Sequence, residues 1–145
     1  MRRILAALIV VVAAVTPAIA DDGLTAGAYE IEVTLELPYV VDTNTRKFER
    51  LCLGPERSDT LGLMVLSNNN PLGKCPTSNA KSSTSRLSFD VACPGVNAAT
   101  GHALYEIRSD GFQGRIDMKM GGKNMTMTEV QVGHRIGTCD MLRTH

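Results

Sequence analysis

Alternation of apolar and polar residues is the main pattern along this chain. Residues 29–37 carry Tyr, Ile, Val, Leu and Leu at every second position, with three glutamates and one threonine between them. A period of two is typical of a β-strand with one buried and one solvated face. Similar stretches follow over 45–53, on both sides of a turn at 82–85, on both sides of a turn at 109–111, and over 125–136. The pattern therefore predicts about seven strands.

Turn-prone residues between these stretches indicate how the strands are connected. Asp110-Gly111 favours a tight hairpin, because both residues tolerate positive φ angles, and residues 121–124 turn the chain again. Residues 55–57 (Pro-Glu-Arg) predict the start of a short helix, since proline suits the first helical position and acids suit the first turn. We expect a mainly β fold: a single antiparallel meander of about seven strands, forming a strongly curved sheet or an incomplete barrel, with at most one short helix.

Residues 1–20 have the layout of a secretory signal peptide. Two arginines precede the uncharged run 4–15, and the small residues Ala18 and Ala20 suit a signal cleavage site. We expect cleavage after Ala20, a periplasmic or secreted product, and a single β domain over residues 21–145. A membrane anchor is the alternative, but a span needs about 20 apolar residues, more than this run offers. No second long apolar run follows, so we expect no transmembrane segment after cleavage.

All four cysteines lie beyond the predicted cleavage site. Disulfides persist in oxidising compartments, and four cysteines allow three pairings. The segment between Cys75 and Cys93 has the pattern of a hairpin with equal arms, which predicts a Cys75–Cys93 disulfide. Elimination then leaves Cys52 to pair with Cys139. A metal or redox site is the alternative, but no two cysteines have CxxC spacing.

Charge and aromatic content exclude several classes of partner. Loss of Arg2 and Arg3 with the signal peptide takes the basic count from 15 to 13 against 15 acids, a net charge of about −2 with neutral histidines. This balance fits neither a nucleic-acid surface nor an anionic membrane. Three tyrosines, three phenylalanines and no tryptophan offer few platforms for stacking sugars or bases.

The chain carries no constellation of residues that is typical of a catalytic site. No GxSxG, HExxH, Walker-type or GxGxxG motif occurs. Glu30, Glu32 and Glu36 share one face of the first predicted strand, where a solvated side explains them better than a sheltered acid pair. The three histidines are scattered, so no zinc site is favoured. We expect a protein that is not an enzyme.

Four methionines form the most distinctive chemical pattern. Met118 and Met120 alternate on one predicted strand, and Met125 and Met127 alternate on the next. If the loop between the strands has an even number of residues, all four thioethers share one face of the sheet. Thioethers are soft ligands that select Cu(I), which makes copper binding a hypothesis. Methionine as a flexible filler of the core is the alternative, and it is favoured because Met118 and Met120 continue an apolar face.

Several short motifs occur in order along the chain: Gly27-Ala28-Tyr29-Glu30-Ile31, Cys52-Leu53-Gly54-Pro55-Glu56, Cys93-Pro94-Gly95, the methionine hairpin and Gly133-His134-Arg135-Ile136-Gly137-Thr138-Cys139. Together they resemble the Domain of Unknown Function 3617 family, small exported proteins of proteobacteria. The resemblance covers essentially the whole chain after the signal peptide, although Tyr29 stands where that family often has tryptophan. It implies an exported small β domain and no known activity.

The sequence therefore predicts an exported binding domain without a cofactor. Its expected partner is an apolar small molecule inside the curved sheet, or an envelope protein across its surface. The alternative function is that of a Cu(I) carrier or buffer, in which the four methionines hold the metal.

Overall fold

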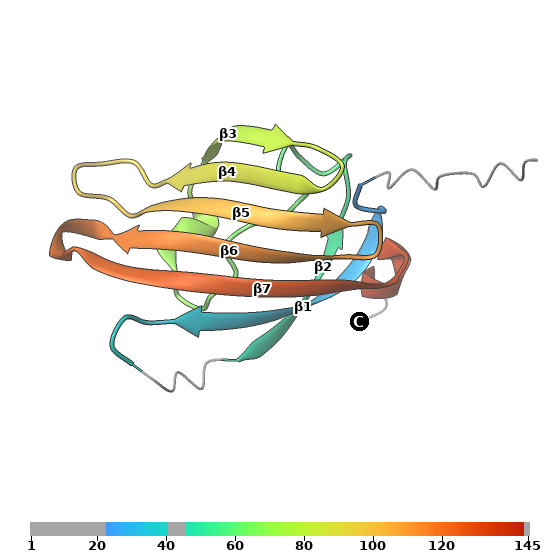
Figure 1. Ribbon diagram of the computed structural model, residues 1–145, viewed down its shortest axis with the longest axis horizontal. Coiled ribbons are helices and arrows are strands. Elements are labelled where there is room, and N and C mark those ends of the chain that lie inside the picture. The colour runs from blue at the N-terminus through green and yellow to red at the C-terminus, as the bar shows by residue number, and fades with distance from the viewer. Residues whose placement is uncertain (1–22, 41–45, 144–145) are drawn as a thin grey trace, which may run out of the picture.

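The computed structural model describes residues 23–40 and 46–143, which form one antiparallel sheet of seven strands (Figure 1). The predicted signal peptide lies outside the described residues. Three short 3₁₀ helices and no α-helix occur within the described ranges, so the mainly β fold is confirmed. The elements are β1 (Gly27–Glu36), β2 (Lys47–Leu53), η1 (Pro71–Lys74), β3 (Thr77–Ser82), β4 (Arg86–Ala92), β5 (Thr100–Arg108), β6 (Gly111–Met120), η2 (Gly121–Lys123), β7 (Met125–Gly137) and η3 (Cys139–Arg143).

The order of the strands across the sheet is β2-β1-β7-β6-β5-β4-β3. Strands β3 to β7 form the expected meander, whereas the first hairpin joins the sheet through β1, which pairs with β7. The sheet is not closed, because β2 and β3 stand at opposite edges. Residues 54–76, which we call the cover segment, must therefore pass from one edge to the other. Figure 1 shows this segment, in green, behind the strands.

Alternation along the strands divides the sheet into two faces. The face toward the cover segment, called the inner face, carries the core. Its aromatic rings form a chain in which Tyr29 contacts Phe112, Phe112 contacts Tyr105, and Tyr105 contacts Phe89, with ring centroids 6.1, 5.7 and 6.0 Å apart. The buried apolar side chains of this face are Tyr29, Ile31, Val33, Leu87, Phe89, Val91, Ala103, Tyr105, Ile107, Phe112, Ile116 and Met118.

Two glycines make room for these rings. A Cβ atom at Gly114 would overlap the ring of Tyr105 on the neighbouring strand, and one at Gly133 would overlap the ring of Phe112. We expect Gly114→Ala to lower the free energy of unfolding by about 2 kcal/mol, because the buried ring has no space to move. Urea unfolding measures this change. Gly122→Ala is the control, since its Cβ would meet Asn97 at ordinary contact distance, and an equal effect of both substitutions would contradict the prediction.

The cover segment fills the inner face with its own side chains. Leu63, Val65 and Leu72 are each at most 4% exposed. The short helix expected from residue 55 does not form, and the chain follows successive turns instead. Leu61 and Gly62 have φ angles of 58° and 85°, in the left-handed region that ends a helix. This path turns the leucine and valine side chains toward the sheet.

Two disulfides hold the segment and the end of the domain in place. Cys75 pairs with Cys93 and joins the end of the cover segment to the residue after β4. Cys52 in β2 pairs with Cys139 at the start of η3. The Cys75–Cys93 pair is the one that the hairpin pattern predicts, and the Cys52–Cys139 pair is the one that elimination leaves. None of the four cysteines is free.

Candidate functional site

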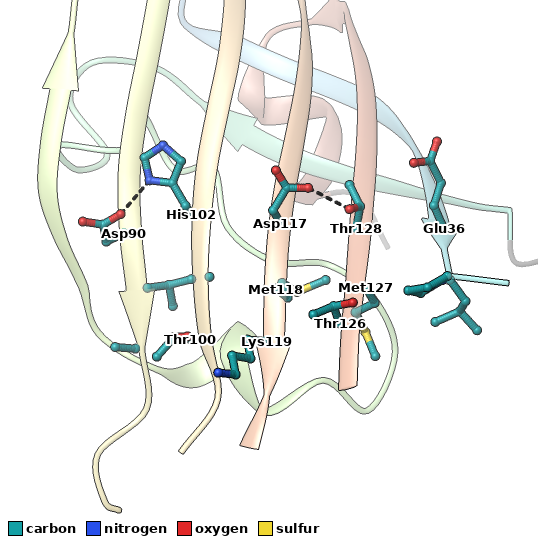
Figure 2. A pocket seen from close by; sticks show the side chains of 15 residues that line it. Glu36, Asp90, Thr100, His102, Asp117, Met118, Lys119, Thr126, Met127 and Thr128 are labelled. Atoms are coloured by element: carbon teal, nitrogen blue, oxygen red, sulfur yellow. Dashed lines mark hydrogen bonds and ion pairs between the residues drawn. The ribbon is translucent and has the colours of Figure 1, made fainter. Parts of the chain in front are cut away.

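The opposite, outer face of the sheet carries a row of polar side chains on five adjacent strands. Strand pairing aligns the five residues so that each is the register partner of the next. Figure 2 shows their side chains projecting from the same face. We call this set the outer row; it consists of Glu36 on β1, Thr128 on β7, Asp117 on β6, His102 on β5 and Asp90 on β4.

Hydrogen bonds across the strands fix much of the outer row. Asp90 Oδ1 lies 2.6 Å from His102 Nδ1, and Asn79 donates to the other oxygen of Asp90 at 2.8 Å. The hydroxyl of Thr128 donates to Asp117 at 2.7 Å. The hydrogen bond with His102, followed by that from Asn79, holds the pKa of Asp90 below its usual value. The row therefore presents fixed acceptors at the surface.

A cleft of about 870 Å³ lies over the outer row. Thr100, Lys119 and Thr126 continue its floor toward the end of the sheet, and Leu37 and Pro38 border it after β1. Its side chains reach solvent, since those of His102 and Asp90 are 61% and 41% exposed. The cleft is therefore accessible from outside.

Exposed apolar residues lie next to this cleft on the same face. Leu104 on β5 and Val132 on β7 are 52% and 43% exposed, and Val130, also on β7, is half-buried. They line a hollow of about 400 Å³, which we call the apolar hollow after these three residues; Glu106, Gln113, Gly114 and Arg115 complete its lining. Arg115 also donates to Glu36 of the outer row at 3.1 Å, so it links the apolar hollow to the polar cleft. A surface with both features suits a ligand that offers apolar and polar groups together.

The inner face contains a polar cluster that sequence reasoning missed. Glu129 and Gln131 on β7 are fully buried. The carboxylate of Glu129 accepts hydrogen bonds from the backbone N–H groups of Leu66 and Ser67 at 2.8 and 2.9 Å, and from Gln131 Nε2 at 2.6 Å. Gln131 Nε2 also donates to the carbonyl oxygen of Met64 at 2.8 Å. We call Glu129 and Gln131 the clamp, because they attach the cover segment to the sheet.

Tyr105 on β5 completes the clamp, two strands away from Glu129 and Gln131 on β7. Its hydroxyl donates to Gln131 Oε1 at 3.0 Å. Burial, and then the negative charge of Glu129, raise the pKa of Tyr105 well above its usual value. Within the described residues, no buried side-chain nitrogen or oxygen lacks a hydrogen-bond partner. The cluster is thus a satisfied structural network.

The structure places the sequence-predicted site residues as follows. Met118 pairs with Met127 and Met120 pairs with Met125, so the two arms of the hairpin bring all four to one face. Glu30 and Glu32 lie on the outer face with arginine partners at 2.9 Å. Among the described residues, no three His, Cys, Asp or Glu side chains are grouped closely enough to hold a metal ion.

Fold and site together define a class of protein: a small disulfide-bonded β domain with an open sheet. One long connection covers the inner face of the sheet, and no element of residues 23–40 and 46–143 covers the outer face. Residues 24–139 match the family described as Protein of unknown function (DUF3617), and the chain belongs to this family. Comparison with curated proteins and with solved structures gave no match. In the described part of the chain, no helix has the length and apolar character needed to cross a membrane.

Proposed function

We propose that the protein is exported and acts outside the cytoplasm as a non-enzymatic binding protein that holds an envelope protein on the outer face of its sheet. One observation carries the proposal: on the outer face, an apolar hollow lies beside a polar cleft, with no element of the described chain in front of them (Figure 1). Aliphatic side chains half exposed beside fixed polar groups are typical of protein interfaces. The two disulfides support export, because they persist in oxidising compartments.

Filling of the inner face favours the outer face as the binding surface. An apolar small molecule inside the curve of the sheet would have to displace Leu63, Val65 and Leu72, which are buried there. It would also have to open the clamp, where Glu129 accepts two backbone hydrogen bonds from the cover segment. The outer face requires neither change.

Exposure of the outer row favours binding rather than catalysis. The hydrogen-bonded pair of Asp90 and His102 lies in solvent, where the low-dielectric shelter that tunes a catalytic acid or base is missing. Ser88 on β4 is a partner of Leu104 and not of His102 in the strand register. Ser88 therefore lies diagonal to His102 and not opposite it, although both line one small pocket with Asp90.

Native mass spectrometry of the protein, purified from its own host without denaturation, tests the proposal. We expect a chain that begins at residue 21, because the signal peptide has been removed, and a copurified protein. In the double variant Leu104→Asp/Val132→Asp the binding free energy for that protein, once identified and purified, should fall by about 2 kcal/mol or more, since carboxylates would be buried in an apolar contact.

Val96→Asp is the matched control for this experiment. Val96 is 94% exposed but lies in the loop between β4 and β5, away from the apolar hollow. This variant should keep the partner, and all three proteins should unfold at similar urea concentrations. A copurified small apolar molecule that the double variant still binds would contradict the outer-face proposal. An uncleaved chain in the cytoplasmic fraction would contradict export.

A further inference from the structure

The methionine hairpin offers a ligand set that the proposed outer-face function does not use. Met118 on β6 is the register partner of Met127 on β7, and Met120 is the partner of Met125. Residues 121–124 connect the strands, so the connection has the even length that keeps both pairs on one face. Side chains opposite each other in antiparallel strands have Cβ atoms about 5 Å apart. Figure 2 shows Met118 and Met127 side by side on the two strands.

Burial changes steadily along this group of four. Met118 is 2% exposed and belongs to the core, Met120 and Met127 are partly buried against it, and Met125 is 52% exposed. The group therefore begins in the apolar interior and ends at the surface. A filler of the core would explain Met118, but it does not explain a fourth methionine placed mostly in solvent. The exposed end gives an ion a route to the inner sulfurs.

One sulfur of the group is already oriented by a neighbour. Asn70, in the cover segment, donates a hydrogen bond from Nδ2 to the sulfur of Met118 at 3.2 Å. The same amide nitrogen donates to Ser67 Oγ at 2.9 Å, and the amide oxygen accepts from the backbone N–H of Leu72 at 3.0 Å. A thioether sulfur has two lone pairs, so this contact leaves one lone pair of Met118 for a metal. Fixed outer groups of this kind orient ligands in metal sites.

Competing ligands lie on the other face of the sheet or are already engaged. Asp117 alternates with Met118 and Met120 along β6 and therefore faces the opposite way. His102 and Asp90 follow Asp117 in the strand register and share its face. All four cysteines are in disulfides and offer no thiolate. Glu129 shares the face of the methionines, but its carboxylate already accepts hydrogen bonds from Leu66, Ser67 and Gln131. Among the described residues, the side chains left for a metal at this end of the hairpin are thus thioethers. Such soft, neutral ligands select Cu(I) over Zn²⁺ and Cu(II), which prefer nitrogen, oxygen or thiolate.

We infer that Met118, Met120, Met125 and Met127 form a Cu(I) site at the end of the β6–β7 hairpin. Methionine is unbranched and flexible, so sulfurs from two facing pairs can converge on one ion. Binding involves no electron transfer and no loss of a proton, because a thioether coordinates as a neutral group. Met118 and Met127 also line the cleft over the outer row, but the Cu(I) inference does not depend on the outer-face function.

Titration with Cu(I) under anaerobic conditions, in competition with a chromogenic Cu(I) chelator, tests the inference. The exported chain is used with both disulfides intact, as checked by the absence of thiol reaction with Ellman's reagent. We expect one Cu(I) per chain and X-ray absorption with sulfur neighbours. Replacing all four methionines by leucine should weaken Cu(I) binding by about a hundredfold or more. Loss of a residue that only hydrogen-bonds to a metal ligand can already lower metal affinity by about that much.

Two further variants separate loss of ligands from loss of fold. Met120→Leu/Met125→Leu changes only the pair nearest the surface and should also weaken Cu(I) binding, while volume-conserving substitution keeps the core intact. Met64→Leu/Met141→Leu changes methionines outside the hairpin and should bind Cu(I) like the unchanged chain. Failure of the unchanged chain to compete with the chelator would overturn the inference. Equal binding by the quadruple variant would overturn it as well.

Discussion

Replacing Glu129 by glutamine is expected to lower the free energy of unfolding by about 3 kcal/mol. The buried carboxylate accepts three hydrogen bonds, and the substitution replaces one of its accepting oxygens by a donating NH₂ group. The carboxylate holds the backbone N–H groups of Leu66 and Ser67 on separate oxygens. A glutamine of the same shape can accept one of these bonds, but its NH₂ group then faces the other N–H. A small domain is stable by about 5–15 kcal/mol in total, so the loss is large.

Two measurements check this prediction at different scales. Urea unfolding should show a lower midpoint with an unchanged slope, since the native fold is retained. Hydrogen exchange at the amides of Leu66 and Ser67 should accelerate more than exchange in the centre of β6, because the cover segment is released first. Glu36→Gln is the matched control: Glu36 is 53% exposed and pairs with Arg115 in solvent, where such pairs contribute about 1 kcal/mol or less. Equal stability of the Glu129 variant and the unchanged chain would refute the clamp.

The strands could be predicted from the sequence because each has a local signal. The alternation over 29–37 and the Asp110-Gly111 turn correspond to β1 and to the β5–β6 hairpin in the structure. The position of β1 beside β7 has no such signal, since pairing between distant segments depends on the whole sheet. The path of the cover segment also has none, because Leu61 adopts a positive φ that leucine rarely takes.

The site was less predictable than the fold, for a reason visible in β7. Its inner face carries Glu129 and Gln131, and its outer face carries Val130 and Val132. Polarity alone would assign these faces the other way round. The available signal was the register. The four-residue connection at 121–124 places Met125 on the inner face with Met118 and Met120, and alternation along β7 then places Glu129 on the same face. The apolar hollow on the outer face is the direct consequence of this reversed pattern.

Replacing Cys52 and Cys139 by serine is expected to lower the free energy of unfolding by about 4.5 kcal/mol, against about 3 kcal/mol for serines at Cys75 and Cys93. The order follows from the length of chain that each bond closes in the unfolded state. The first bond spans 87 positions and the second spans 18, and a longer closed loop removes more entropy from the unfolded chain. The larger effect therefore belongs to the bond that joins an edge strand to the end of the domain.

The two double variants also differ in where they loosen the protein. Cys52 lies in β2, which pairs with β1 alone among the strands, so its loss should speed hydrogen exchange in β2. Loss of the second bond should act on the end of the cover segment and on β3 instead. Urea unfolding in non-reducing buffer measures the energies, and the reduced unchanged chain is the control that should be at least as unstable as either variant. A larger loss of unfolding free energy in the Cys75/Cys93 variant would show that loop length does not decide which bond stabilises the domain more. It would mean that the cover segment needs its disulfide more than β2, at the edge of the sheet, needs the Cys52–Cys139 bond.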